Sequence, residues 1–532
     1  MIRYKDPKQM TIEEFDWPFI SEMDKNNRWV KLSETIPWNE LAEGYYQSLS
    51  ESRGRPGLDA RLVIGAVIIK HKLCLSDRET VAQIQENPYL QYFVGLPGFQ
   101  MKEPFAPSLF VEIRKRMGEA VFDVFQDAII HAVDKAKAGR QSQRSSVKQT
   151  KKPDDSEPPA SSSGEPPSSS EIGTPGTEAT SHQGKLLLDA TVCPQAIRYP
   201  TDLNLLNEAR EFSEQIIDIL YASQKQQGKK PRTYRIKARK DYLKIAKQKR
   251  ASAKGRRRGI KQQLQYLRRN LKHIEKLLCF FEEGTPLPLP RWLLYRYWVI
   301  QHLYDQQRHM YDNKVNRCDE RIVSISQPYV RPMVRGKLDK PVEFGAKLSV
   351  SLNSDQIAVV DELRWNAFHE GQDLPQQVED YKARHGYYPE VVLADTIYGS
   401  RANRQYLKSK DIRFAGKPLG RPKKVTTENQ QAIKQEKAKQ REEYRQRIPI
   451  EGKFGQGKNG YRLNYIRAKR ADTSYAWINS IFLVMNLMVL LRIFFALQKG
   501  HISRALAALI KKINEITTHL GNIKVAPMIF NA

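Results

Sequence analysis

Apolar positions in residues 1–138 recur with a helical period. An apolar run that begins after Asp59 (ARLVIGAVIIKHK) has the length and composition of a buried helix. Ser76 follows this run, and Glu79 stands at the spacing that a capping box requires at the start of a helix. The pattern therefore predicts two consecutive helices separated by a short break.

The same helical region continues to residue 138. The stretch after Pro88 is rich in aromatic residues and is expected to be a loop, and Ser108 is expected to begin an amphipathic helix that runs through Phe122 and Phe125. Two helices joined by a tight turn are compatible with a DNA-reading unit. An ordinary helical bundle explains the pattern equally well, because no base-contacting position can be picked out.

Residues 139–184 interrupt the periodic pattern. Runs such as DDSEPPASSSGEPPSSS contain almost no apolar side chain that could be buried. We therefore expect a disordered linker between two folding units, and its acidic, Ser/Pro-rich character should keep it off DNA.

Short apolar runs that end in an acidic residue appear after the linker. The run KLLLDATV predicts a buried strand with Asp189 at its tip, and YPEVVLAD predicts a second strand that ends at Asp395. Further strands are expected at 342–352 and 356–360. Because strands of open α/β sheets commonly present site residues at their carboxyl ends, the pattern predicts an α/β domain with both aspartates in one site.

Residues from about 203 to 335 are predicted to be helical and strongly basic. Between Lys225 and Lys276 only two residues are acidic, whereas basic clusters recur along the segment. Such a face would contact phosphates without reading bases; a solvated helical arm is the alternative interpretation. The arginines that we single out for DNA contact are Arg256, Arg257 and Arg258.

One apolar segment, residues 476–497, is long enough to cross a membrane. Asn479, Asn486 and Arg492 interrupt it, and polar or charged residues near a bilayer centre are costly. We therefore expect a helix buried in a protein core and no membrane partner. The first residues carry no apolar run, so no signal peptide is expected.

Composition points to a nucleic-acid partner. The 532 residues allow two or three domains, and 88 Lys and Arg against 59 Asp and Glu give a formal charge of +29. A polyanion is the partner that this charge favours; an anionic membrane or a basic tail that aids solubility are the alternatives. The four cysteines form no CxxC pair and the histidines form no HExxH motif, which argues against zinc sites and disulfides and fits a reducing cytoplasm.

Acidic residues carry the candidate chemistry. Phosphodiester cleavage by two Mg²⁺ ions needs about three converging carboxylates, and these hard cations prefer oxygen ligands. Asp189 and Asp395 suit this role. An aspartate at the end of a strand is also a common turn or helix-cap residue, so neither is decisive alone, and a third acid is required.

A resemblance supplies the third acid. The segment YRQRIPIEGKFGQGK places its tyrosine, arginine, glutamate and lysine at the spacing Y-x2-R-x3-E-x6-K, which resembles the YREK signature of bacterial insertion-sequence DDE transposases. The stretches LLLDATVCPQAIRYPTDLNLLNEAR and VVLADTIYGSRANRQYLK resemble the first and second Asp blocks of these families, in the expected order. The signature residues are Tyr444, Arg447, Glu451 and Lys458.

The chain is most similar to the lineages named insertion sequence five and insertion sequence 1182. GRPGLDARLVIGAVIIKHKLCLSDRETV is similar to their N-terminal domain, and VMNLM at 484–488 fits their final helix. The resemblance implies an RNase H-like catalytic domain over residues 185–498, with the basic helical insertion inside it and a C-terminal tail at 499–532.

The resemblance also implies the site residues and partners. Asp189, Asp395 and Glu451 would hold two Mg²⁺ ions, with Mn²⁺ as a substitute, and Tyr444, Arg447 and Lys458 would contact transposon-end DNA around the cut phosphate. The implied partners are double-stranded DNA, as terminal inverted repeats and as target, and at least a second copy of the chain. A bacterial cytoplasmic, nucleoid-associated protein is expected. A catalytically inactive DNA-binding derivative and an RNase H-fold nuclease are the alternatives.

Pro449 lies inside the signature. A proline should break a helix that runs up from Tyr444, so Tyr444 and Arg447 are expected to approach the site from a preceding turn. Pro449 would then occupy the first turn of a new helix, on which Glu451 and Lys458, seven residues apart, share a face.

Overall fold

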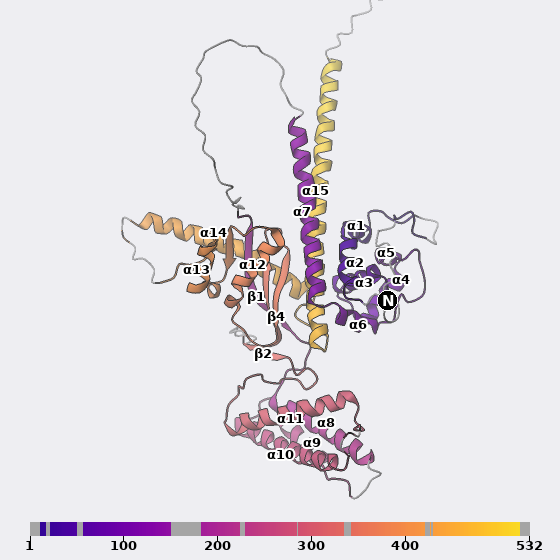
Figure 1. Ribbon diagram of the computed structural model, residues 1–532, viewed down its shortest axis with the longest axis vertical. Coiled ribbons are helices and arrows are strands. Elements are labelled where there is room, and N and C mark those ends of the chain that lie inside the picture. Colours follow the sequence, from indigo (N-terminus) through magenta and orange to yellow (C-terminus); the bar gives the residue numbers. More distant parts are fainter. Residues whose placement is uncertain are drawn as a thin grey trace, which may run out of the picture.

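The computed structural model describes residues 11–16, 22–49, 57–149, 182–223, 229–282, 284, 286–334, 342–420, 426 and 429–521, with the backbone alone described at 139–149 and 497–521. Residues 150–181 of the predicted linker lie outside this description. Figure 1 shows three parts: a mixed sheet with its covering helices, a group of N-terminal helices beside it, and a separate helical unit.

The described residues of the N-terminal region form seven helices. Asp59 caps the third helix, since its side chain accepts hydrogen bonds from the backbone N–H groups of Arg61 and Leu62. The predicted capping box of Ser76 and Glu79 is confirmed at the start of the fourth. The helices are α1 (Arg28–Thr35), α2 (Trp38–Tyr46), α3 (Ala60–Lys72), α4 (Asp77–Glu86), α5 (Pro88–Phe93), α6 (Leu109–Arg116) and α7 (Glu119–Gln149).

Two predictions for this region are wrong. The aromatic stretch after Pro88 is the short helix α5, because Asn87 caps it and Pro88 occupies the first helical position, where its missing N–H costs nothing. The helix expected from Ser108 through Phe125 is interrupted: Met117 leaves the helical conformation (φ −81°, ψ 74°), and α7 begins anew after Gly118. Helix α7 also continues beyond residue 138, where the predicted domain ended.

In the part of the chain that the structure describes, the sheet has six strands in the order β2-β3-β1-β5-β6, with β4 paired to β3. Strands β1 and β5 are parallel, as are β5 and β6, whereas β3 runs antiparallel to β1, β2 and β4. The strands are β1 (Lys185–Pro194), β2 (Arg331–Val334), β3 (Val342–Leu352), β4 (Ala358–Arg364), β5 (Val391–Ala394) and β6 (Arg413–Ala415). The predicted strand at 356–360 is shifted, because Asn353 to Gln356 form the turn between β3 and β4.

Strand residues alternate between two covered faces. Leu186 and Leu188 of β1 pack under α12 (Leu374–His385) and α13 (Arg401–Ser409), together with Val392 of β5. Leu187 points to the opposite face, which is covered by α14 (Gln430–Gly460) and α15 (Ala471–Gly521). Two short 3-10 helices, η1 (Glu370–Gln372) and η2 (Thr396–Tyr398), complete this part.

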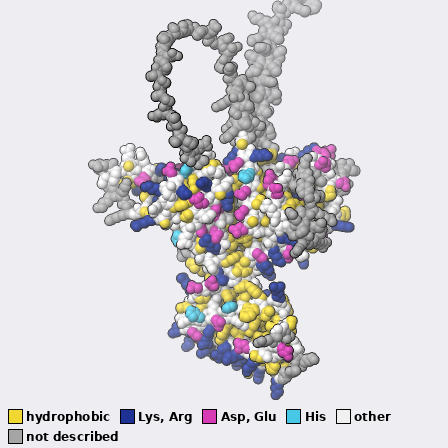
Figure 2. All heavy atoms as spheres, in the orientation of Figure 1, with side chains coloured by type: hydrophobic (Ala, Val, Ile, Leu, Met, Phe, Trp, Pro, Cys, Tyr) yellow, Lys and Arg dark blue, Asp and Glu magenta, His cyan; other side chains and the backbone are white. Residues whose placement is uncertain are grey.

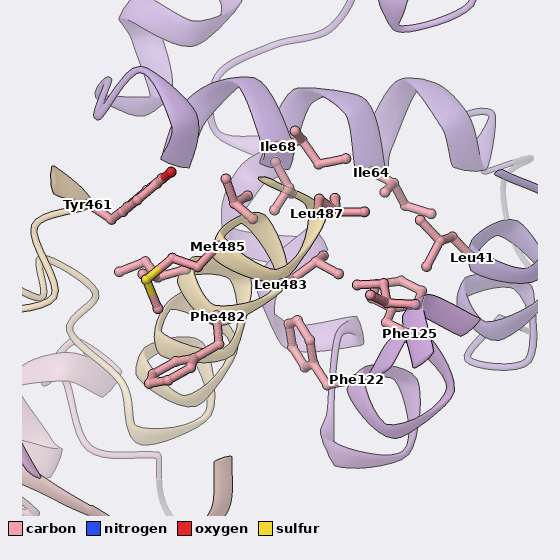
Figure 3. Packing of buried hydrophobic residues seen from close by; sticks show 14 of the residues in the cluster. Leu41, Ile64, Ile68, Phe122, Phe125, Tyr461, Phe482, Leu483, Met485 and Leu487 are labelled. Atoms are coloured by element: carbon pink, nitrogen blue, oxygen red, sulfur yellow. The ribbon is translucent and has the colours of Figure 1, made fainter. Parts of the chain in front are cut away.

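Helix α15 joins the sheet to the N-terminal helices. Figure 3 shows Phe482, Leu483, Met485 and Leu487 of α15 packed against residues of the N-terminal helices such as Phe122, and one continuous core includes both regions and the sheet. Asn486 is buried within this core, where its amide donates to Gln126 Oε1 (2.8 Å) and to the Ala358 carbonyl (2.7 Å). We call the sheet, α1–α7 and α12–α15 the body.

The predicted core helix is confirmed. Among the described residues, α15 is the one helix long and apolar enough to cross a membrane, but 67% of its most apolar window is buried inside the protein. Burial against the sheet and the N-terminal helices accounts for its apolar composition. The helix continues to Gly521, so the predicted tail at 499–532 begins inside it.

The basic segment forms a separate helical unit, which we call the insertion. Its helices have their own core, which contains Leu206, Leu267 and Ile300. They are α8 (Asp202–Ser223), α9 (Arg235–Ala246), α10 (Ala253–Leu278) and α11 (Arg291–Asp312). The mixed α/β fold with a helical N-terminal region is thus confirmed, and the RNase H-like assignment stays a prediction.

Candidate functional site

The register of β1 and β5 brings Asp189 and Asp395 together. Leu188 of β1 pairs with Ala394 of β5, and the next residue of each of these segments is an aspartate at the same level of the sheet. Asp189 is not at a strand tip as predicted, because β1 pairs with β3 as far as Pro194 and continues past the end of β5. The two aspartates still lie side by side, because the parallel pairing of β1 with β5 ends at Leu188 and Ala394, immediately before them.

Local hydrogen bonds orient both carboxylates. Asp189 Oδ1 accepts a hydrogen bond from the backbone N–H of Ala190 (2.8 Å). Asp395 Oδ1 caps η2 by accepting from the N–H of Thr396 (2.7 Å). Asp189 is half-buried within the sheet, whereas the Asp395 side chain is 55% exposed. The two acids therefore differ in environment although they are neighbours.

Helix α14 supplies Glu451, Tyr444 and Arg447, and it runs unbroken through Pro449. The prediction that Tyr444 and Arg447 lie on a preceding turn is therefore wrong. Proline inside a helix costs about 3 kcal/mol through a lost hydrogen bond and a steric clash. Burial of Ile450 and Phe454 against the rest of the body offsets that cost, because each buried side chain contributes about 1.5–3 kcal/mol.

Side-chain contacts hold α14 to the sheet near Pro449. Gln446 Oε1 accepts from Lys185 Nζ of β1 (3.0 Å), and Glu443 pairs with Arg413 of β6. Arg447 makes the third contact, to Asp395. The helix is thus anchored to β1, to β6 and to the residue that follows β5, just before Glu451.

Arg447 lies between two of the acids. Its Nη2 donates to Glu451 Oε1 at 2.8 Å, and its Nη1 lies 3.4 Å from Asp395 Oδ1. The guanidinium also lies over the Tyr444 ring, 5.2 Å from its centroid. Only 12% of the Arg447 side chain is exposed, whereas Tyr444 is 61% exposed. Arg447 therefore bridges the sheet and the helix at the site.

The third acid belongs to the same electrostatic cluster. Burial raises the pKa of Asp189, and the charges of Glu451 and Asp395 raise it further. The Ala190 N–H and the Arg447 guanidinium act in the opposite direction and lower this pKa. We call Asp189, Asp395 and Glu451 the acid cluster; the structure brings these three predicted residues together around Arg447.

The acid cluster has the ligand chemistry of a Mg²⁺ or Mn²⁺ site but not its spacing. All donors are carboxylate oxygens, which these hard cations prefer. Within the part of the chain that the structure describes, however, no three His, Cys, Asp or Glu side chains are close enough to hold a metal ion. The guanidinium of Arg447 contacts two of the three carboxylates.

A cavity of about 710 Å³ opens beside Asp395. Its apolar lining includes Leu393, Ala415 and Ile448, and Tyr444 contributes an aromatic ring. Apart from Arg447, sequence reasoning missed the cations that line the cavity, although Lys437, Arg441 and Arg445 recur every fourth residue on α14 and so share one face. The cationic residues that line the cavity are Lys417, Lys437, Arg441, Arg445 and Arg447.

Lys458 lies farther along α14. Seven residues separate it from Glu451, which places it roughly 10 Å along the helix axis on a similar face. The predicted DNA contact of Lys458 stays a prediction.

The three insertion arginines lie in a different unit from the acid cluster. Arg256 and Arg258 are exposed, but Arg257 is half-buried on Tyr311, with its guanidinium 4.1 Å from the ring centroid and its Nη2 2.9 Å from the Tyr311 carbonyl. Arg257 therefore stabilises the packing of α10 on α11.

Sequence reasoning missed a longer cationic stripe on one exposed face of α10, formed by Lys254, Arg258, Lys261, Arg268, Lys272 and Lys276.

The stripe lies on the outer side of the insertion. Figure 2 shows Lys and Arg side chains gathered along the edge of the insertion that is farthest from the body, where Figure 1 places α10. Successive members of the stripe are three, four or seven residues apart, which are the spacings of one helix face, so the stripe could have been found by marking those spacings in the segment.

Comparisons with known proteins agree with the site. Residues 392–488 match a family model described as a transposase DDE domain, and residues 19–116 match one described as a transposase domain. An uncharacterised protein, ORF8 in the nfe locus of Rhizobium meliloti, is 28% identical over 231 residues, which cover 43% of this chain and 83% of the relative. No solved structure matches the chain. The two matched domains support an insertion-sequence transposase that cuts DNA, and the first contains Asp395 and Glu451.

Proposed function

We propose that this protein binds the terminal inverted repeats of an insertion sequence and catalyses metal-dependent DNA cleavage and strand transfer. The observation that carries the proposal is the convergence of Asp189, Asp395 and Glu451 from β1, β5 and α14 around one arginine. Asp395 and Glu451 lie in the segment that matches a transposase DDE domain, which supports the assignment.

The acid cluster would hold the metal ions. Two Mg²⁺ or Mn²⁺ ions bound there would supply Lewis-acid stabilisation of the attacking and leaving oxygens of the phosphodiester. Side chains of α14 would bind and position the DNA. Arg447 and Tyr444 would bind the DNA backbone at the cut phosphate, and the cations around the 710 Å³ cavity would hold the adjoining strand in position.

The insertion would contact flanking or target DNA. The stripe on α10 carries cations at helical spacing, which suits a phosphate backbone and gives no base-specific pattern. The N-terminal helices, which match a transposase domain, are proposed to recognise the transposon end. The protein would act in the bacterial cytoplasm, on the nucleoid.

The active assembly is proposed to contain at least two copies of the chain, because both ends of an element must be cut together. Light scattering of the protein with paired terminal repeats should give the mass of a dimer or larger. Only monomers on paired ends would contradict this part of the proposal.

A strand-transfer assay tests the function. Linear DNA that carries the cognate terminal repeats should be cut and joined to a target plasmid in Mg²⁺ or Mn²⁺, and chelator should stop the reaction. Binding of ends without cutting would indicate an inactive DNA-binding derivative. Cutting without joining would indicate a nuclease on the same fold, for which Tyr444, Arg447 and Lys458 would not be needed.

A further inference from the structure

Arg447 contacts two of the three acids to which the proposed function assigns the metal ions. We propose that Arg447 is an internal counter-ion that keeps metal ions off the acid cluster until a DNA phosphate draws it away. Metal binding would then depend on DNA. This inference rests on the proposed function, because it assumes that the acid cluster is the metal site.

The contacts of Arg447 show why it competes with a metal ion. One guanidinium contacts acids on two different elements, Glu451 of α14 at 2.8 Å and Asp395 after β5 at 3.4 Å. The same carboxylate oxygens would be needed as ligands. Asp395 and Glu451 are 55% and 48% exposed, so solvent and ions reach them, and the single positive charge of Arg447 offsets only part of their two negative charges.

A phosphate bound in the adjacent cavity would offer Arg447 a second partner. Arg447 already lines the cavity beside Asp395, together with Arg441, Arg445 and Lys417, whose charges would draw a phosphate there. A guanidinium matches phosphate oxygens as well as it matches a carboxylate. Rotation of the Arg447 side chain, without movement of α14, would exchange its carboxylate partners for a phosphate. The freed carboxylates would then be available to cations.

This exchange couples two ligands. If DNA removes the competitor of the metal, DNA raises the affinity for metal, and by linkage metal raises the affinity for DNA by the same factor. A protein without DNA would therefore carry little metal in the acid cluster. The arrangement would restrain cleavage away from a correctly bound transposon end.

Binding of Mn²⁺ to the full chain, followed by the electron paramagnetic resonance signal of free Mn²⁺, tests the inference without measuring cleavage. In the absence of DNA, Arg447→Gln should bind Mn²⁺ about tenfold more tightly than the native protein, a difference of about 1.4 kcal/mol. Arg447→Lys, which keeps the positive charge but loses the simultaneous contact with two carboxylates, should have an intermediate Mn²⁺ affinity. The matched control is Lys439→Gln, which removes one positive charge from an exposed position of the same helix and should leave the affinity unchanged.

Two further measurements identify the site and the coupling. Adding Glu451→Gln to the Arg447→Gln protein should abolish the gain, because a ligand is removed. Duplex carrying the transposon end should raise the Mn²⁺ affinity of the native protein towards that of Arg447→Gln, measured against the Glu451→Gln protein with the same duplex to subtract ions bound by DNA.

The outcomes separate this inference from the proposed function. Equal affinities of the native and Arg447→Gln proteins, with binding that still requires Glu451, would overturn the counter-ion role and leave the proposed function standing. Weaker binding by Arg447→Gln would also overturn it, since Arg447 would then be organising the acids. Mn²⁺ binding that never depends on the acids, with or without DNA, would overturn both.

Discussion

The N-terminal helices and the insertion share a helical periodicity in sequence, but their hydrophobic cores differ. Helices α1–α7 share one hydrophobic core with the sheet, through α15, whereas α8, α10 and α11 of the insertion enclose a core of their own. Figure 1 shows the result: the N-terminal helices lie against α15, and the insertion stands apart from the body. A helical periodicity therefore predicts helices, but whether they form a domain depends on what their apolar faces meet.

The contact between the N-terminal helices and α15 includes buried charge. Lys70 and Arg114 lie over the ring of Trp477, 4.6 and 5.3 Å from its centroid, and both pair with Asp77. His71 packs edge-on against the same ring at 5.3 Å. The insertion also buries one cation, Arg210, which pairs with Glu214 of the same helix. What distinguishes the insertion is the exposed stripe of α10, which faces solvent.

The largest expected difference is in autonomous folding. Residues 200–330 expressed alone should unfold cooperatively, because the core of the insertion is complete. Residues 1–138 alone should not, because Phe122 and the other residues that face α15 would be exposed, each at about 1.5–3 kcal/mol against a total stability of about 5–15 kcal/mol. Circular dichroism during heating checks both, and a cooperative transition of residues 1–138 would make the N-terminal helices an independent domain.

Substitutions in the acid cluster should affect chemistry and spare binding. Asp189→Asn, Asp395→Asn or Glu451→Gln each remove a proposed metal ligand with little change in size, so cleavage should fall by roughly a thousandfold or more. Affinity for the transposon end, measured by fluorescence anisotropy, should stay within a few-fold of the native value. Near-native cleavage by one variant would remove that residue from the proposed site.

The buried charges at the contact with α15 should control the stability of the whole body. Asp77→Asn leaves Lys70 and Arg114, whose side chains are 2% and 8% exposed, without their counter-ion. Loss of one partner of a buried pair costs about 3–5 kcal/mol, and the 27% exposure of Asp77 favours the lower figure. Urea unfolding followed by hydrogen exchange should show the N-terminal helices and the sheet losing protection together while the insertion keeps its own.

The matched control for Asp77 is an exposed ion pair of the same region. Glu112→Gln breaks the pair with Lys115, and both side chains of that pair are well exposed. No measurable change in stability is expected, because surface ion pairs contribute little. Equal effects of the two substitutions would contradict a structural role for the buried charges.

Protonation of His71 should weaken the same contact. Burial lowers the pKa of His71 well below 6.5, and the positive charges of Lys70 and Arg114 lower it further. An unfolded chain takes up this proton near pH 6.5 and the folded protein does not, so the free energy of unfolding should fall as the pH drops below 6.5. The slope for one proton is at most about 1.4 kcal/mol per pH unit. His71→Phe, which keeps a ring against Trp477, should flatten the profile between pH 7 and 5.

The smallest expected effect is on the salt dependence of DNA binding. Arg258→Ala, Lys261→Ala and Arg268→Ala together should flatten the slope of log affinity against log salt by about 0.9 for each phosphate that the variant no longer neutralises. Binding should weaken similarly for all sequences, and preference for the transposon end should survive. An unchanged slope, or loss of end preference with general affinity retained, would show that the insertion does not track phosphates. Arg257 is left intact because it packs α10 onto α11.

Much of the local structure could be predicted because it depends on neighbours in the chain. The capping box at Ser76 needs only Ser76 and Glu79, and the run that ends at Asp395 is a strand followed by a capping aspartate. Such features are set by contacts within a few residues.

The rest was decided by tertiary contacts. Asp189 lies inside β1 because β3, far along the chain, extends the pairing beyond β5. Helix α14 continues through Pro449 because Ile450 and Phe454 are buried within the body, a contribution that local propensity cannot contain. The position of Arg447 between Asp395 and Glu451 requires the sheet and the helix to meet. The sequence by itself thus determined which residues carry charge and how they are spaced, and only the packing of distant segments decided which of those charges face one another.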